Sequence, residues 1–139
     1  MNIEDFPLAW RWTGTAHTVL PIDVLKTLIP LCLESAELLS KSVPLAFPDS
    51  SSKFDAANTQ LDAGDWLRKL RVPAQQITLS WNKSMALSLP WLTFCTYWDE
   101  FCYSTSDDVD IFLKDKQRFL RWNHFELFEY DSSTLLTKN

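Results

Sequence analysis

The N-terminal segment alternates apolar and polar positions in the manner of a half-buried strand. Over residues 8–13, a leucine and two tryptophans occupy every second position, with alanine, arginine and threonine between them, and Gly14 follows. A repeat of two residues places every second side chain on the same face of a strand, and glycine commonly ends such a segment. The pattern predicts a strand over residues 8–13.

Apolar residues then recur at helical spacing. The first stripe consists of Ile22, Leu25, Leu28 and Ile29. Pro21 suits the first turn of a helix, whereas Pro30 ends or kinks one. Leucine and alanine recur again after Pro30 and stop before Pro44. Residues 21–42 are therefore predicted to form two short helices that meet at a bend.

The middle of the chain combines an irregular segment with three predicted elements. Residues 43–61 are rich in proline and serine and show no sustained period, so we expect mostly a loop. Residues 62–71 place tryptophan and leucine on one helical face. Residues 76–89 contain two alternating runs separated by a polar turn at 82–84, which predicts a hairpin.

Residues 90–102 carry the clearest helical pattern of the chain. One face is formed by Trp91, Phe94, Cys95, Trp98, Phe101 and Cys102. Because these positions are separated by three or one residues, they form one continuous apolar stripe, and the thiols lie on it among the aromatic rings. We expect a helix whose cysteines serve as packing groups.

The C-terminal part predicts a second hairpin over residues 108–122, with its turn at the polar residues 114–117. Residues 124–130 alternate like a strand but also fit helical spacing, so both assignments stay open. Residues 131–139 are expected to be a frayed tail. The chain should form a single α+β domain over 1–139, with an antiparallel sheet packed against N-terminal helices and the helix near 90–102. The strand 8–13 should join this sheet.

Composition excludes several classes of function. The chain of 139 residues has only two glycines, whereas phosphate-binding loops need several close together. The net charge of −5 and the absence of a basic cluster argue against nucleic-acid binding. No apolar run has the roughly 18 residues of a membrane span. Three widely spaced cysteines favour a reduced, cytoplasmic setting with buried thiols.

Candidate chemistry centres on the segment from Cys102 to His124. A cysteine nucleophile would need a histidine beside it, and this pair is the best available. A metal site could draw on Asp107, Asp108, Asp110, Glu126, Glu129 and His124, but the glycine and closing glutamate of a calcium loop are missing. Acid–base chemistry could use Asp99 with Glu100, or Glu126 with Glu129. No cofactor is expected.

The excess of aromatic residues favours a different function. The chain has seven tryptophans, a side chain that often anchors protein interfaces. An acidic surface around aromatic residues would attract a basic partner. We therefore expect a non-enzymatic protein-binding module, with a small cysteine- or metal-dependent hydrolase as the alternative and a homodimer as the third. The candidate binding residues are Trp98, Tyr103, Asp107, Asp108, Asp110, Trp122 and His124.

Several stretches resemble a family of small bacterial proteins described as domain of unknown function 2947. The similar stretches are "AWRW", "LPIDVLKTLIPLCLESAELL", "GDW" and "FCYSTSDDV". The matching positions are Trp10, Trp12, Leu20, Pro21, Ile22, Leu25, Ile29, Pro30, Leu31, Ala36, Leu38, Asp65, Trp66, Phe101, Cys102 and Tyr103. The resemblance covers the first three-quarters of the chain and ends after Val109. It implies a bacterial, cytosolic α+β domain and no activity.

In composition alone, the chain is also similar to immunity proteins, which neutralise a toxin by blocking it. Such a likeness is an analogy of small acidic proteins and involves no motif. It makes an immunity-type inhibitor the most specific form of the protein-binding hypothesis.

Overall fold

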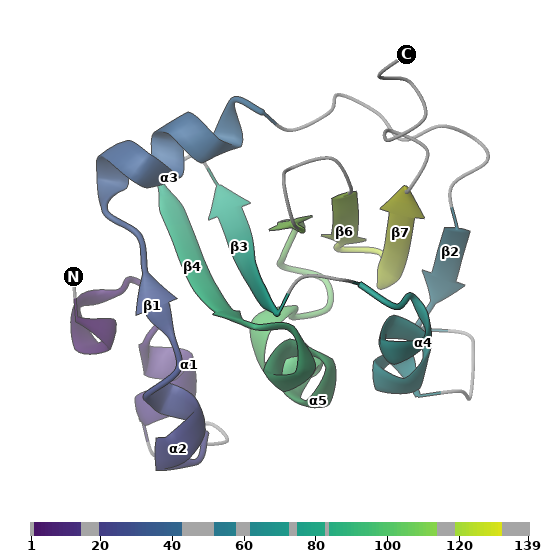
Figure 1. The fold of residues 1–139 in the computed structure, drawn as a ribbon, viewed down its shortest axis with the longest axis horizontal. Coiled ribbons are helices and arrows are strands. Elements are labelled where there is room, and N and C mark those ends of the chain that lie inside the picture. Colours follow the sequence, from purple (N-terminus) through teal and green to yellow (C-terminus); the bar gives the residue numbers. More distant parts are fainter. Residues whose placement is uncertain are drawn as a thin grey trace.

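A computed structural model describes residues 2–14, 20–42, 52–57, 62–72, 75–82, 84–113 and 119–131 (Figure 1). The helical elements are a 3₁₀ turn at Ile3–Asp5, α1 (Trp10–Thr13), α2 (Ile22–Leu25), α3 (Leu33–Ser40), α4 (Ala63–Lys69) and α5 (Trp91–Phe101). The strands are β1 (Ile29–Pro30), β2 (Ser52–Asp55), β3 (Gln76–Asn82), β4 (Met85–Pro90), β5 (Val109–Phe112), β6 (Phe119–Asn123) and β7 (Leu127–Asp131). The predicted class, a single α+β domain with an antiparallel sheet, is confirmed.

The described strands form one antiparallel sheet in the order β1-β4-β3-β5-β6-β7-β2. The centre consists of strands that are close in sequence, since β3 pairs with β4, and β5, β6 and β7 form a meander. The two outer strands come from earlier parts of the chain: β1 pairs with β4 and β2 pairs with β7. The first half of the chain therefore supplies the two edge strands of the sheet, and the second half supplies the central strands.

Both faces of the sheet are covered, and two apolar clusters result. Leu87 and Ile111 belong to the large cluster that includes α5, whereas their neighbours Ala86 and Phe112 belong to a smaller cluster beneath α3. Adjacent strand residues point to opposite faces, so these two pairs define the two sides. Figure 1 shows α3 across the upper ends of β3 and β4, with α4 and α5 beside the lower part of the sheet. α5 lies against the larger core.

The prediction of a helix over 90–102 is confirmed by α5. Pro90 occupies the N-cap position, and the predicted apolar face is buried except at Trp98, which is half-buried. The backbone leaves helical geometry at Tyr97, where φ is −115° and ψ is 24°. This kink lies one turn before the end of α5, where the chain turns towards β5.

Three other predicted elements are also confirmed. The helix predicted over 62–71 is α4, and the carboxylate of its N-cap residue Asp62 accepts a hydrogen bond from the Gly64 backbone N–H. The hairpin over 76–89 is the pair β3–β4. The hairpin over 108–122 is the pair β5–β6, although its turn at 114–117 lies outside the described residues.

The prediction of a strand over residues 8–13 is wrong, because this segment forms the short helix α1. The Trp12 N–H donates to Ala9 O, and both the N–H and the hydroxyl of Thr13 donate to the same carbonyl. Trp12 and its neighbour Arg11 are both buried, whereas Trp10 is 51% exposed. A strand would place Trp10 and Trp12 on the same face, so the alternation was misleading over so few residues.

The predictions for residues 21–61 need two corrections. The pair of helices predicted over 21–42 is interrupted by β1, and the supposed inward residues Ile22 and Ile29 are 64% and 56% exposed. The predicted loop over 43–61 contains the edge strand β2. Phe54 explains the strand, since its ring is buried and lies 5.4 Å from that of Trp66. The rest of that loop, apart from 56–57, lies outside the described residues.

The open assignment over residues 124–130 resolves as a turn followed by β7. Phe128 is buried on this strand, and Asp131 belongs to it as well. The rest of the predicted tail, 132–139, lies outside the described residues. No helix within the described ranges has the length and apolar character needed to cross a membrane.

We predict that Gly64→Ala destabilises the protein. A Cβ at this position would lie 2.7 Å from the backbone oxygen of Cys95, so α4 and α5 would have to separate. We expect a loss of about 1–3 kcal/mol in the free energy of unfolding, measured by urea denaturation. Alanine is otherwise the better helix former by ~1 kcal/mol, so an unchanged or increased stability would contradict the close contact. Asp65→Ala, at the exposed neighbouring position of α4, is the control.

Candidate binding site

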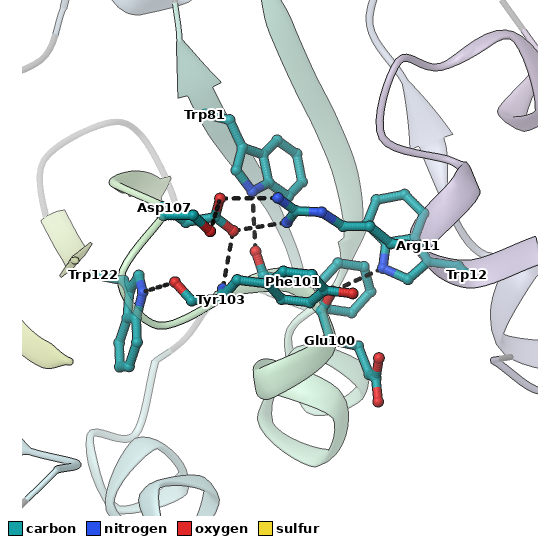
Figure 2. A network of polar contacts seen from close by, with 9 residues as sticks. Arg11, Trp12, Trp81, Glu100, Phe101, Tyr103, Asp107 and Trp122 are labelled. Atoms are coloured by element: carbon teal, nitrogen blue, oxygen red, sulfur yellow. Dashed lines mark hydrogen bonds and ion pairs between the residues drawn. The ribbon is translucent and has the colours of Figure 1, made fainter. Parts of the chain in front are cut away.

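The C-terminal end of α5 and the first residues after it are held by three tryptophan side chains from three different elements. The last carbonyls of a helix have no partner within the helix and must find other donors. Here indole N–H groups of α1 and β3 supply them, and an indole of β6 binds the loop that follows (Figure 2). The bonds are Trp12 Nε1 to Glu100 O at 2.8 Å, Trp81 Nε1 to Phe101 O at 3.0 Å, and Trp122 Nε1 to Tyr103 O at 3.2 Å. The helix end is thereby fixed from several sides.

A buried ion pair fixes the loop that follows α5. Arg11 donates two hydrogen bonds to the carboxylate of Asp107, at 2.7 Å and 2.9 Å, and both side chains are 7% exposed. The Tyr103 backbone N–H donates to the same carboxylate, and the Arg11 guanidinium lies 3.9 Å from the centre of the Tyr103 ring. Figure 2 shows Arg11 reaching across from α1 to this loop. The loop from Tyr103 to Asp107 therefore packs around the guanidinium group of Arg11.

Beside this network lies a pocket of about 300 Å³. It is formed by the end of α5, the loop after it, β6, and the turn between β6 and β7. The lining residues are Trp98, Asp99, Cys102, Tyr103, Ser104, Trp122 and Glu126. Glu126 has a positive φ of 64°, and the Thr105 N–H donates to His124 O, which ties the turn to the loop. Three aromatic residues and two carboxylates thus surround one hollow.

The aromatic wall is a packed cluster. The Trp98 ring centre lies 5.4 Å from that of Trp122 and 5.6 Å from that of Phe128, and the latter two are 4.8 Å apart. Trp122 and Phe128 are buried, whereas Trp98 and Tyr103 are half-buried. Trp98 and Tyr103 are therefore the rings that a ligand could contact most directly.

Cys102 contributes bulk to the pocket wall and is poorly suited to be a nucleophile. Burial raises the pKa of its thiol well above the usual value, and the negative charge of Asp107 acts in the same direction. A nucleophilic cysteine needs its thiolate form near neutral pH. Within the described residues, no hydrogen bond joins Cys102 to His124.

The structure separates the seven predicted binding residues into two groups. Trp98, Tyr103 and Trp122 line the pocket. The three aspartates and the histidine do not line the pocket, and each pairs with another side chain. Asp107 pairs with Arg11, Asp110 pairs with Arg121 at 2.7 Å, and Asp108 lies 2.9 Å from Nδ1 of His124.

These pairings give the hydrolase alternative no support. The residues proposed for it were Cys102, His124 and the cluster Asp107–Asp110. Asp108 and His124 do meet, but Asp107 is bound by Arg11, and within the described residues no hydrogen bond joins Cys102 to His124. Among the described residues, no group of three histidine, cysteine, aspartate or glutamate side chains is arranged to hold a metal ion.

Sequence reasoning missed the acidic half of the pocket. The sequence suggests Asp99 only as an acid–base partner of Glu100, and Glu126 only as a partner of Glu129 or as one of several metal ligands. Asp99 directly follows Trp98, a candidate binding residue, and this adjacency is a signal that could have drawn attention to it. The sequence could not place Glu126 at the pocket, because its position depends on the turn before β7, and the pattern of residues 124–130 fits both a strand and a helix.

Cys32 also differs from the prediction that all three thiols are buried, because it is exposed at the N-cap of α3. Hydrogen bonds from the Ser35 hydroxyl and backbone lower the pKa of its thiol. By contrast, burial raises the pKa of Cys95 to about 12.

We predict that removing either partner of the Arg11–Asp107 pair destabilises the protein strongly. Arg11→Met and Asp107→Asn each leave a buried charge without its partner, which costs about 3–5 kcal/mol. Because Arg11 Nε is buried without a partner among the described residues, the pair is not fully satisfied. The double variant should therefore be no less stable than either single variant in urea denaturation.

The exposed pair Asp65–Arg68 provides the matched control for this cycle. Asp65→Asn and Arg68→Met should each change the free energy of unfolding by less than about 1 kcal/mol, since exposed pairs contribute little. Additive effects of Arg11→Met and Asp107→Asn would show that the two side chains do not depend on one another.

We predict one fast-reacting thiol in the folded protein. At neutral pH, DTNB should modify Cys32 first, because only its pKa is lowered, and Cys32→Ser should abolish this fast phase. Ser35→Ala removes the hydroxyl that lowers the pKa, so the reaction should then require higher pH. Cys95 and Cys102 should react only when the protein unfolds. Equal rates for all three thiols would contradict the burial described above.

Comparisons with family models, with curated proteins and with solved structures yield no match to this chain. The resemblance to domain of unknown function 2947 therefore stays a prediction, and the function has to be argued from the pocket itself.

Proposed function

We propose that this protein is a non-enzymatic binding module for another protein, and that its binding surface surrounds the pocket at the end of α5. The observation that carries the proposal is the composition of the pocket: Trp98 and Tyr103 present half-buried rings beside the carboxylates of Asp99 and Glu126. Aromatic anchors surrounded by polar groups are typical of protein interfaces.

The turn that supplies Glu126 adds a third aromatic ring to this surface. Phe125 is 75% exposed, and its ring centre lies 4.2 Å from that of His124. The Phe125 N–H donates to the side chain of Asn123, which orders the backbone of the turn that presents the ring. An exposed ring on an ordered turn loses little conformational entropy on binding, which favours its use as a contact.

The charge of the chain favours a basic partner. The net charge is −5, and the pocket contributes two carboxylates. Complementary charge accelerates association and disfavours like-charged partners. A homodimer through this surface would bring two acidic patches together, since the same patch meets itself across a two-fold axis. We therefore favour a different, basic protein over a second copy.

Within this class, we propose a cytoplasmic immunity-type inhibitor as the specific case. An inhibitor of this type needs a fixed surface and no chemistry of its own. The buried Cys102 and the paired Asp107 agree with that requirement, since neither is free to react. A bacterial toxin with a basic active-site surface would be the corresponding partner.

We predict that Phe125→Ala weakens binding to the partner by at least about tenfold, as expected for a central aromatic contact. The partner would be captured from a lysate of the source organism, purified, and titrated by calorimetry. Leu92→Ala removes another exposed apolar side chain, near the opposite end of α5, and should leave the affinity unchanged. Equal affinities for Phe125→Ala and the unmodified protein would overturn the proposed surface.

A further inference from the structure

We infer that the pocket at the end of α5 holds the guanidinium group of one arginine side chain of the partner. This inference rests on the proposed function, because the arginine would belong to the bound protein. It identifies the chemical group that enters the pocket and the side chains that receive it.

The charges around the pocket favour a cation. The seven lining residues include two carboxylates, Asp99 and Glu126, and no basic side chain. Neither carboxylate forms an ion pair within the described part of the chain. The nearby Arg11 does not compensate for them, because Asp107 already neutralises its charge through two hydrogen bonds. The pocket is therefore a local site of negative charge.

The aromatic wall favours a guanidinium group over other cations. A cation over the face of tryptophan or tyrosine is attracted by the ring, and the planar guanidinium stacks on such rings while its N–H groups bind carboxylates. The chain already contains one example, since the guanidinium of Arg11 lies 3.9 Å from the centre of the Tyr103 ring. Because the Arg11 guanidinium already contacts the face of the Tyr103 ring, we expect the incoming guanidinium to stack mainly on the Trp98 ring. Asp99, the next residue of α5, and Glu126, in the turn before β7, would supply the carboxylates.

The size of the pocket is compatible with a single side chain. Its volume of about 300 Å³ is at the lower end of the range for small-molecule sites, roughly 300–1,000 Å³. Its walls are held by hydrogen bonds, including the part-buried one between the Trp122 indole and Tyr103 O. A hollow of this size suits one arginine side chain that reaches in from a bound protein.

The probe for this inference is N-acetyl-arginine amide, titrated into the ¹⁵N-labelled protein and followed by NMR. The indole N–H signals of Trp98 and Trp122 should shift in a saturable manner. N-acetyl-citrulline amide has nearly the same shape without the charge and should bind about tenfold more weakly. N-acetyl-lysine amide should also bind more weakly, because its ammonium group does not stack. Raising the salt concentration should weaken the binding of the arginine probe.

The substitutions Asp99→Asn and Glu126→Gln should each weaken binding of the arginine probe severalfold, and the double variant should abolish it. Glu37→Gln makes the same change of charge at an exposed position of α3 and serves as the matched control. The same spectra report whether each variant is folded. Equal shifts with arginine and citrulline, or an unchanged affinity in the double variant, would overturn the inference. Equal binding of lysine would overturn the choice of arginine.

These results can be distinguished from those of the partner experiment. If Phe125→Ala weakens binding to a captured partner while the arginine probe leaves Trp98 unaffected, the proposed function stands and the arginine inference fails. If the probe binds as expected but the affinity for the partner does not depend on Phe125, the pocket chemistry stands and the proposed surface fails.

Discussion

The capping of α5 by indole groups is the constraint on which the rest of the structure depends. The last carbonyl groups of a helix have no partner within it, and leaving them unpaired where the protein covers them is costly. The tryptophan side chain suits this role, because its ring is apolar and its indole N–H is a hydrogen-bond donor, while the side chain carries no acceptor that would need a partner of its own. Trp12 of α1 and Trp81 of β3 donate to the last carbonyls of α5, and Trp122 of β6 donates to Tyr103 O just after it. The end of α5 is therefore the region where α1 and two strands of the sheet are joined by hydrogen bonds.

The ion pair between Arg11 and Asp107 extends this constraint to the N-terminus. The two residues are 96 positions apart in sequence, and their side chains meet in the interior. Trp12, the next residue, enters the core and bonds to Glu100 O. α1 therefore contributes a cation and an indole from adjacent positions, which a helical turn can direct to neighbouring sites and a strand would direct to opposite faces. The tertiary contacts select the helix over the strand that the alternation suggested.

The sequence predicted the elements whose pattern is long and local, and failed where distant contacts decide. α5 and the two hairpins were predicted because their apolar positions repeat over several turns or strand pairs. The helix α1 and the strand β2 were missed, since each has four residues and depends on partners far along the chain. The site shows the same division. Trp98 and Tyr103 could be chosen from their position near the end of α5, whereas Glu126 required knowledge of the turn before β7.

The pocket is a consequence of how α5 ends. The indoles and the buried ion pair hold the loop from Tyr103 to Asp107 in one position, so the hollow beside it does not have to form when a ligand arrives. Preorganisation of this kind reduces the entropy lost on binding. It also explains why Cys102 is a wall of the pocket: a thiol buried in a fixed cluster of rings cannot easily ionise or move towards a substrate. The interactions that stabilise the fold thus favour recognition at this site and disfavour catalysis.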